Sequence, residues 1–348
     1  MTPAAKQAAF AEQVIAWQRS HGRNDLPWQS SRDPYRVWLS EIMLQQTQVV
    51  TVLAYYERFI ARFADVSALA AASADEVLAL WSGLGYYSRA RNLHRCAQLI
   101  AAEHGGRFPR SSAQLMQLPG IGRSTAAAIA AFCFGERVAI LDGNVKRVLT
   151  RVLGFGGDLA EAASERALWA KATALLPERD IERYTQGVMD LGATLCSARA
   201  PACEACPVAT LCQAGREGKA ERYPLKTRRL LRTRRENWWL WLEWRGHVWL
   251  QQRPHSGVWG GLWTLPLHDD EPGVDAIALA LGTRLELLPM IEHALTHFDW
   301  VLHPRRARLA RKPAPALLGQ GRWVARADLA AIALPAPLRR LLAASQTT

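Results

Sequence analysis

Residues 115–129 read LMQLPGIGRSTAAAI and describe the end of one helix, a tight turn and the start of another. Gly120 and Gly122 in this turn can adopt positive φ angles and bring bare backbone close to a ligand. The small-residue run that begins at Arg123 predicts a helix whose exposed N–H groups suit a phosphate. Many helix–turn–helix connections have this form, so the interpretation depends on the rest of the chain.

The sequence on both sides of this turn has a helical pattern from residue 4 to about residue 194. Ala-rich segments of mixed polarity are separated by short Gly, Pro, Ser or Asp punctuation, which is typical of successive helices. The clearest helical segments are 34–60, 86–103, 123–134, 143–153 and 161–176. We therefore expect the N-terminal half to be all-α.

Length and charge suggest two domains and a polyanionic partner. The chain has 348 residues, a net charge of +12 and a pI near 9.9. Such a surplus of cations favours nucleic acid, although a basic protein without such a partner is the plainer alternative. The sequence has no long apolar run, so we expect neither a signal peptide nor a membrane span. We therefore expect a cytoplasmic, nucleoid-associated protein.

The C-terminal part of the chain has a different pattern. Residues 222–235 carry seven basic and no acidic side chains, which suits a linker along phosphates or a solvated tether. Residues 237–253 are aromatic and alternate around Arg245 and Gly246, which predicts a β-hairpin. Residues 296–309 predict another strand. We expect an α+β unit in this part of the chain.

Two acidic residues stand out in the helical half. Asp142 follows a short apolar run and precedes an amphipathic helix, so by itself it is more often an N-cap than a catalytic group. Glu41 lies in VWLSEIMLQQTQV, residues 37–49, where apolar neighbours surround nearly the whole helix. Most helical glutamates face water, but burial among these neighbours would raise the pKa of Glu41 and keep it protonated near neutral pH.

Four of the six cysteines lie between residues 196 and 212. Disulfides are rare in a reducing compartment, so this cluster predicts metal ligands. The cluster comprises Cys196, Cys203, Cys206 and Cys212. Cys96 and Cys133 lie in helical patterns, and we expect them to be buried packing residues.

These motifs resemble one family closely. LPGIGRSTA resembles the helix–hairpin–helix signature of DNA repair glycosylases, and SEIMLQQTQV with the downstream GLGYYSRARNL resembles MutY-type adenine DNA glycosylases of the endonuclease III superfamily. VWGGLWTLP (258–266) and HALTHFDW (293–300) resemble the NUDIX-like domain of that family. The resemblance covers about residues 10–300, densely before residue 235.

The resemblance implies a mainly α glycosylase fold with an iron–sulfur loop, followed by an α+β NUDIX-like domain. The expected glycosylase domain is 1–221, with a six-helix barrel at 26–136 that contains the hairpin. Residues 1–25 and 137–221 would form the iron–sulfur subdomain. The basic linker would be 222–235, and the lesion-recognition domain 236–348.

The resemblance also implies residue roles in a base excision repair enzyme. Glu41 would be the general acid that protonates adenine N7, and Asp142 would stabilise the cationic sugar or bond to it briefly, with Asn144 near the sugar. The hairpin at Gly120 and Gly122 would hold a DNA phosphate with a monovalent cation. Relatives that also cut the backbone have a lysine at the position of Ser124, so we expect a monofunctional glycosylase.

The expected substrate is double-stranded DNA with adenine opposite 8-oxoguanine or G, bound by a monomer. Residues expected to read the mispair are Gln46, Thr47, Leu84, Tyr86, Thr296 and His297. The family often has Phe-Ser-His where this chain has Leu295-Thr296-His297, so a hydroxyl and the histidine are kept but the aromatic ring is not.

The cysteine spacing C-x6-C-x2-C-x5-C matches the 4Fe–4S cluster loop of the endonuclease III and MutY superfamily. Structural zinc usually shows paired C-x2-C motifs and is the alternative for this loop. Three other hypotheses are a DNA-binding protein without catalysis, an endonuclease III-like pyrimidine glycosylase, and a nucleotide pyrophosphatase. The last needs a glutamate-rich metal-binding helix, which residues 267–290 lack.

Overall fold

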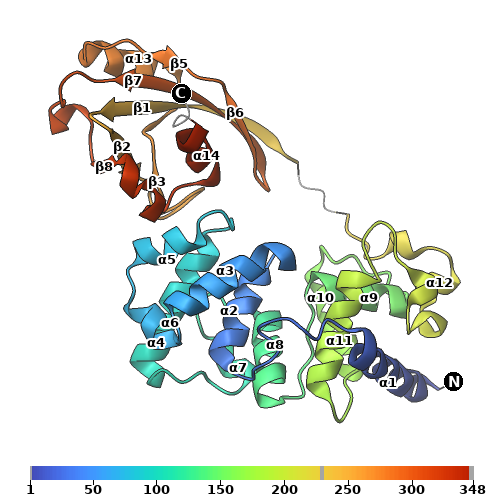
Figure 1. The fold of residues 1–348 in the computed structure, drawn as a ribbon. Helices are drawn as coiled ribbons and strands as arrows, with labels where there is room; N and C mark the ends of the chain where they lie inside the picture. Colours follow the sequence, from blue (N-terminus) through green and yellow to red (C-terminus); the bar gives the residue numbers. More distant parts are fainter. Residues whose placement is uncertain (1, 228–230, 345–348) are drawn as a thin grey trace. The chain divides into compact units, whose positions relative to one another are not determined.

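The computed structural model describes residues 2–227 and 231–344, and the chain forms two compact units (Figure 1). The helical unit comprises Met1–Ala70 with Arg95–Arg229, and the mixed unit comprises Ala71–His94 with Leu230–Thr348. Residues 228–230 of the expected basic linker lie outside the described residues. No described helix is both long and apolar enough to cross a membrane.

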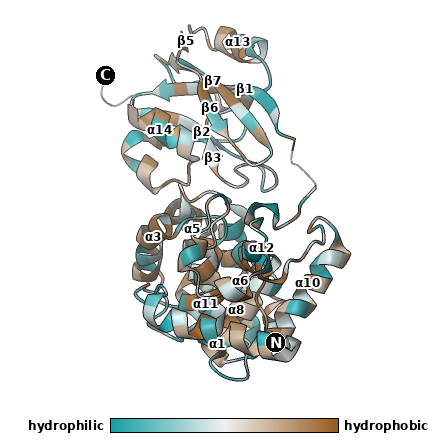
Figure 2. Ribbon diagram, turned by 90° about the vertical axis from the view of Figure 1, so that its right-hand side faces the viewer, coloured by the Kyte–Doolittle hydropathy of each residue, from teal (hydrophilic) through white to brown (hydrophobic). Residues whose placement is uncertain are grey.

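Helices build almost the whole first unit. They are α1 (Pro3–His21), α2 (Pro34–Leu44), α3 (Val49–Arg62), α4 (Val66–Ala71), the part of α6 (Ser88–His104) from residue 95, α7 (Ser112–Leu115), α8 (Arg123–Phe134), α9 (Gly143–Leu153), α10 (Ala162–Ala174), α11 (Ile181–Thr194) and α12 (Gln213–Arg216). Figure 2 shows hydrophobic positions concentrated among the helices around α8 and α11. The all-α expectation for this part of the chain is confirmed.

One predicted helical segment is divided in two. The pattern of residues 34–60 is continuous in sequence, but α2 ends at Leu44 and α3 begins at Val49. Gln46 has a φ of 57°, a left-handed conformation that cannot continue a right-handed helix. The expectation of one helical run is therefore wrong, because a backbone reversal interrupts a sequence whose side chains continue the helical pattern.

The turn between α7 and α8 is the hairpin that the sequence predicts. Gly120 has a φ of 77°, a backbone conformation that would be strained in a residue with a side chain. Gly122 is the N-cap of α8, and a Cβ atom added to it would meet nothing within 4 Å. The start of α8 is therefore open to a ligand that approaches the backbone.

Helices α9 and α11 pack unusually closely in the core of the helical unit. Val145, Val148 and Leu149 of α9 are buried in one cluster with Val188 and Leu191 of α11. A Cβ atom on Gly192 of α11 would lie 2.6 Å from the Cβ of Asn144 and 3.0 Å from its carbonyl oxygen. The contact between these helices thus requires glycine at position 192.

An eight-stranded mixed sheet forms most of the second unit. Its strands are β1 (Thr233–Trp244), β2 (His247–Gln252), β3 (Trp263–Thr264), β4 (Leu267–His268), β5 (Glu286–Leu287), β6 (Ile291–Ala294), β7 (Phe298–Arg308) and β8 (Arg322–Ala325). The helices α13 (Glu271–Ala280) and α14 (Ala336–Ala344) accompany them. Strands β1 and β2 pair antiparallel and confirm the predicted hairpin, whereas β1 and β7 pair in parallel. The α+β expectation is confirmed.

Residues 71–94, which include α5 (Ala74–Trp81), belong to this second unit. The Ser82 hydroxyl donates to the carbonyl of Leu334 at 2.6 Å, and Arg91 Nη1 donates to the carbonyl of Gly260 at 2.6 Å. A segment from the middle of the helical sequence is thereby bonded to the C-terminal sheet domain.

Candidate active site

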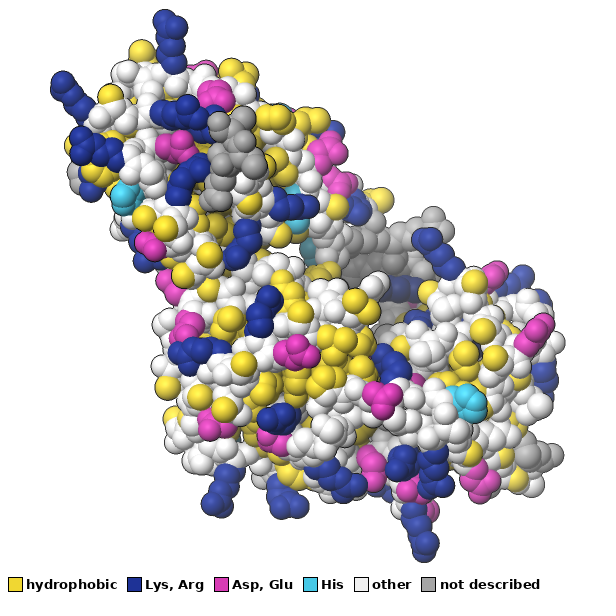
Figure 3. Space-filling view, viewed as in Figure 1, with side chains coloured by type: hydrophobic (Ala, Val, Ile, Leu, Met, Phe, Trp, Pro, Cys, Tyr) yellow, Lys and Arg dark blue, Asp and Glu magenta, His cyan; other side chains and the backbone are white. Residues whose placement is uncertain are grey.

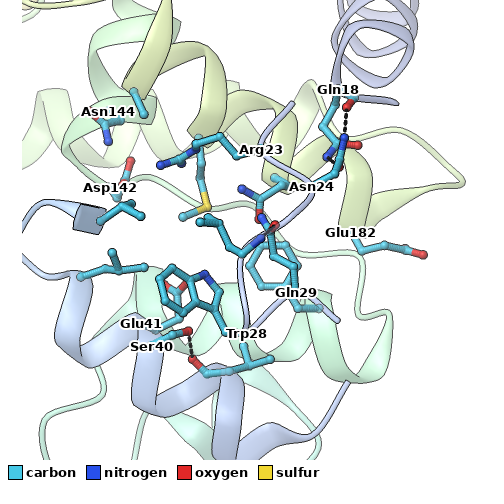
Figure 4. A pocket seen from close by; sticks show the side chains of 18 of the residues that line it. Gln18, Arg23, Asn24, Trp28, Gln29, Ser40, Glu41, Asp142, Asn144 and Glu182 are labelled. Carbon is cyan, nitrogen blue, oxygen red and sulfur yellow. Dashed lines mark hydrogen bonds between the residues drawn. The ribbon is translucent and has the colours of Figure 1, made fainter. Parts of the chain in front are cut away.

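The helical unit contains a cavity of about 870 Å³ that brings the two predicted acids together. Glu41, Asp142 and Asn144 all line it, and Figure 4 shows them facing the same space. The volume lies in the range of about 300–1,000 Å³ that is typical of small-molecule sites. The pocket is large enough to accept a base and part of its sugar.

Glu41 projects into this cavity from α2, a helix most of whose side chains are buried. Val37, Trp38, Ile42 and Met43 of α2 are buried around it. This loss of water, with a smaller contribution from the nearby charge of Asp142, raises the pKa of Glu41 to about 8. The Glu41 carboxyl therefore holds its proton at neutral pH.

Asp142 is both an N-cap and a pocket residue. Its Oδ1 accepts a hydrogen bond from the Val145 N–H at 2.7 Å at the start of α9. Burial raises the pKa of Asp142, while the backbone N–H groups of α9 and the nearby Arg147 and Lys146 oppose that rise. Asp142 caps α9, and the N–H groups at the start of α9 in turn favour the ionised form of the Asp142 carboxyl group.

Asn144 is held by Arg147, one turn further along α9. Arg147 Nη2 donates to Asn144 Oδ1 at 2.9 Å and to the carbonyl of Gly192 at 2.6 Å. Arg147 Nε donates to the carbonyl of Cys196 at 2.7 Å. With its side-chain oxygen engaged by Arg147, Asn144 can use its NH₂ group toward the pocket.

The other residues predicted in the helical unit lie near the pocket or at the hairpin. Thr47 lines the pocket, and the exposed Gln46 precedes it in the left-handed turn after α2. Ser124 is half-buried in the first turn of α8, after the open backbone of Gly120 and Gly122. The backbone at the start of α8 is open, because a Cβ atom added to Gly122 would meet nothing within 4 Å.

The second unit joins two of the predicted lesion-binding residues. The hydroxyls of Tyr86 and Thr296 form a hydrogen bond of 3.1 Å, although the two residues are 210 positions apart. Tyr86 is 44% exposed with a φ of 47°, whereas Leu84 is buried beside it in the same loop. His297 is exposed next to Thr296. An aromatic ring and a hydroxyl are thus presented together at one surface.

The four clustered cysteines line one cavity of about 220 Å³. Arg151, which is 2% exposed, donates from Nη1 to the Sγ of Cys196 at 3.3 Å. Among the described residues, no three His, Cys, Asp or Glu side chains converge as they would on a single ion. Cysteine sulfurs are ligands of both structural zinc and iron–sulfur clusters, so the donor set around this cavity fits either group.

A group of bonded polar residues at the pocket wall was not predicted from the sequence. Arg23 and Gln186 line the cavity, and the fully buried Asp190 binds them both. Arg23 lies in a loop after α1, so no periodic pattern marks it. Asp190 is a charged residue on the buried face of α11. This position in the helical pattern is the sequence feature that could have marked it as a functional residue.

Comparison with known proteins agrees with this geometry. Residues 39–173 match the model of the HhH-GPD superfamily of base excision DNA repair proteins, and residues 237–344 match the NUDIX domain model. Fold and site together define a helix–hairpin–helix base excision DNA repair protein with a C-terminal NUDIX domain. The expected fold class is therefore confirmed.

Individual relatives narrow this class. Adenine DNA glycosylase of Buchnera aphidicola from Schizaphis graminum is 32% identical over 96% of this chain and 97% of its own length. The protein of that name from the Acyrthosiphon pisum strain is 40% identical over 74% of this chain and 73% of its own length. The human one is 42% identical over 60% of this chain, but this covers 40% of its own length. The chain belongs to the adenine DNA glycosylase family.

Solved structures support the fold of the helical half. A thermostable thymine-DNA glycosylase matches with a TM-score of 0.55 and 29% identity over 61% of this chain and 98% of its own. An endonuclease III in a non-covalent complex with DNA matches with a TM-score of 0.53 and 21% identity over 63% of this chain and 99% of its own. The second likeness concerns the fold alone.

Proposed function

We propose that this protein hydrolyses the N-glycosidic bond of adenine opposite 8-oxoguanine or G in duplex DNA, acting as a monomer. The observation that carries the proposal is that one pocket contains both a protonated Glu41 and the carboxyl group of Asp142, which caps α9. Breaking a purine glycosidic bond needs a proton on the leaving base and negative charge near the sugar. The two carboxyl groups supply these in one cavity.

In the proposed reaction Glu41 donates its proton to adenine N7, and the bond between N9 and C1′ then breaks. Asp142 stabilises the oxocarbenium-like sugar, or bonds to C1′ until water replaces it, as in retaining glycosidases. Asn144 lies two residues after Asp142 and hydrogen-bonds near the reacting sugar. Adenine must leave the stack to reach the pocket, at a cost of a few kcal/mol that is lower for a mispair.

The residues that we expect to read the base opposite adenine form two groups, one within each unit. Tyr86 and Thr296 present a ring and hydroxyls together, and Leu84 and His297 lie beside them in sequence. In the helical unit, Gln46 and Thr47 extend from the turn next to the pocket. We infer that these residues enter the stack and contact 8-oxoguanine.

The hairpin and the cysteine loop anchor the protein on DNA. We infer that the N–H groups around Gly120 and Gly122 hold one phosphate, with a monovalent cation on hairpin carbonyls. The four cysteines would hold a 4Fe–4S cluster that fixes their loop against the DNA backbone. An absorption band near 400 nm from the purified protein would distinguish this iron–sulfur cluster from colourless zinc.

Ser124 makes the enzyme monofunctional in this proposal. A serine cannot form the Schiff base by which a lysine at this position would open the sugar and cut the strand. Base release should therefore leave an intact strand until alkali is added. Strong nicking without alkali, together with borohydride trapping of the protein on DNA, would contradict this assignment.

The NUDIX domain is not proposed as a pyrophosphatase. Its helix α13 carries Glu271 and Asp275 rather than a run of glutamates, and Glu271 accepts hydrogen bonds from Arg305. A magnesium-dependent pyrophosphatase needs several free carboxylates on one helix. We assign this domain to lesion recognition instead.

The test of the proposed function is a single-turnover panel of duplexes with adenine opposite 8-oxoguanine, G, C and T. The proposal expects fast adenine release opposite 8-oxoguanine and G, and slow release opposite C and T. Binding of all four duplexes without release from any would indicate a DNA-binding protein without catalysis. Release of damaged pyrimidines instead would indicate the endonuclease III-like alternative.

A further inference from the structure

Tyr86 lies in a strained loop that other parts of the second unit hold in place. Its φ of 47° is a left-handed conformation, which a tyrosine keeps only where its surroundings impose it. Arg89 of α6 donates from Nη2 to the carbonyls of Leu84 and Gly85 at 3.3 Å each, and its guanidinium lies over the Tyr86 ring. The hydroxyl of Tyr86 bonds to Thr296. Tyr86 is thus held both by α6 and by the segment before β7.

Trp259 is a second residue of this unit with a left-handed backbone. It has a φ of 56°, and its side chain is buried. Its ring stacks on that of Trp300 in β7, with 4.5 Å between the ring centroids and 23° between the planes. The next residue is Gly260, where an added Cβ atom would lie 2.5 Å from the carbonyl oxygen of His255. The loop at residues 259–260 therefore has little freedom to move relative to β7.

Thr296 is attached to the same strand. It lies in a tight turn that the Leu295 N–H closes by donating to the carbonyl of Phe298 at 2.9 Å. Phe298 begins β7, and its ring packs edge-on against Trp300 with 5.7 Å between the centroids. The turn that presents the Thr296 hydroxyl therefore starts from the strand that carries the ring stack.

Arg91 connects the 259–260 loop to α6. Its Nη1 donates to the carbonyl oxygen of Gly260 at 2.6 Å, and its side chain is half-buried. Arg91 lies five residues after Tyr86 in the chain. The contacts therefore form a closed path, which runs from Tyr86 to Thr296, along the chain to Trp300, across the ring stack to Trp259, and back through Gly260 and Arg91 to α6.

We propose that Arg91 is a positioning residue for lesion reading, which holds the 259–260 loop against α6 and so sets the distance between the hydroxyls of Tyr86 and Thr296. The inference rests on the proposed function, because it concerns the residues that read the base opposite adenine. Arg91 touches no DNA base in this account. Its effect reaches the lesion because a hydrogen bond of 3.1 Å weakens steeply when its two atoms move apart.

The test is the ratio of two single-turnover rates of the full-length protein, for adenine opposite 8-oxoguanine and for adenine opposite G. Arg91→Met keeps the apolar part of the side chain and removes the donor. It should lower this ratio by about threefold or more, because a bond from a charged donor is lost from the closed path. A merely structural role would lower both rates by a common factor. Arg91→Lys keeps a donor for the one carbonyl and should retain most of the ratio.

A double-mutant cycle tests whether Arg91 acts through Thr296. In the Thr296→Val background the bond to Tyr86 is already absent, so Arg91→Met should change the ratio by less than about twofold. A further fall as large as that in the wild-type background would overturn the proposal. Trp259→Phe keeps the test decisive if Arg91→Met does not fold. Its smaller ring loosens the stack on Trp300 and should lower the ratio in the same direction.

Ser82→Ala is the matched control. It removes another hydrogen bond of 2.6 Å between residues 71–94 and the C-terminal part of the unit, but this bond ends at Leu334, outside the closed path. The ratio should stay within about twofold of the wild type. An equal fall in Ser82→Ala and Arg91→Met would overturn the specific role of Arg91.

The outcomes separate this inference from the proposed function. Unchanged ratios in Arg91→Met and Trp259→Phe would overturn the role of Arg91, while adenine release by the wild type would still support the glycosylase. A wild type that releases adenine equally fast opposite 8-oxoguanine and G would overturn the inference alone. A wild type that releases no adenine would overturn the proposed function itself.

Discussion

Glu41 and Asp142 are carboxyl groups of one pocket, and burial raises the pKa of both, while hydrogen bonds and nearby cations oppose the rise only at Asp142. Apolar neighbours and burial raise the pKa of Glu41 to about 8, whereas Asp142 receives hydrogen bonds from the N-terminus of α9. The proposed acid catalysis beside a developing cation needs one acid that keeps its proton and one whose ionised form is favoured by its neighbours. The role proposed for each acid therefore rests on its local environment rather than on the residue type.

The first prediction concerns the pH dependence of adenine release. Glu41 must be protonated to act as the acid, so its pKa of about 8 sets the upper limit of activity. Single-turnover rates should be steady near neutral pH and fall as the pH rises through about 8. A rate that keeps rising above this pH would show that Glu41 is not the proton donor.

The second prediction concerns stability. The pKa of Glu41 is raised in the folded state, so the unfolded chain ionises first as the pH rises, and this favours unfolding until the folded protein also ionises near pH 8. Glu41→Gln removes this titration. Relative to the wild type, the free energy of unfolding of this variant should increase by roughly 3–4 kcal/mol as the pH rises from about 5 to about 8. Denaturant unfolding at several pH values measures this difference, and a constant difference would contradict the raised pKa.

At the scale of secondary-structure elements, the pocket depends on how closely α9 and α11 approach each other. Gly192 allows that approach and lies against Asn144, two residues after Asp142. The sequence predicted α9 and its capping aspartate because local patterns determine both. It could not predict the contact with Gly192, since glycine has no side chain whose periodicity marks a buried face.

The third prediction tests this contact. In Gly192→Ala the new Cβ atom would lie 2.6 Å from the Cβ of Asn144 and 3.0 Å from its backbone oxygen, so a helix must shift. We expect a loss of about 1–3 kcal/mol in the free energy of unfolding, with slower adenine release. Gly143→Ala is the control for stability, because its Cβ atom would meet nothing within 4 Å. Equal stability of the two variants would argue against close packing at position 192.

Other elements differ in how well the sequence predicts them. The β1–β2 hairpin follows from alternation around Arg245 and Gly246, and the α7–α8 turn follows from its glycines. The break at Gln46 was missed because its apolar neighbours continue the helical pattern. Asp190 was missed because its role depends on Arg23, which is distant in sequence, and only tertiary structure brings these groups together.

At the scale of the whole molecule, the two units divide the proposed work. The helical unit holds the pocket, the hairpin and the cysteine loop, while the mixed unit joins Tyr86 to Thr296. The net charge of +12 supports affinity for DNA without sequence preference. On the face drawn in Figure 3, Lys and Arg are spread over both units rather than gathered in one patch. Selectivity must then come from the particular contacts of each unit.

The fourth prediction separates lesion reading from catalysis. Thr296→Val keeps the shape of the side chain but removes the hydroxyl that bonds to Tyr86. The preference for adenine opposite 8-oxoguanine over adenine opposite G should fall by about tenfold, the value of roughly one lost hydrogen bond. Tyr86→Phe removes the other hydroxyl and should act in the same direction. An unchanged preference in both variants would place lesion reading elsewhere.

The central claim is that a protonated Glu41 and the carboxylate of Asp142 act on one extruded adenine. Single-turnover release of adenine opposite 8-oxoguanine by Glu41→Gln, with binding of the same duplex measured in parallel, tests it most directly. The account predicts a rate at least about 10²-fold below that of the wild type, because the glutamine cannot donate the proton, and nearly unchanged duplex binding. A variant that releases adenine at the wild-type rate would contradict it.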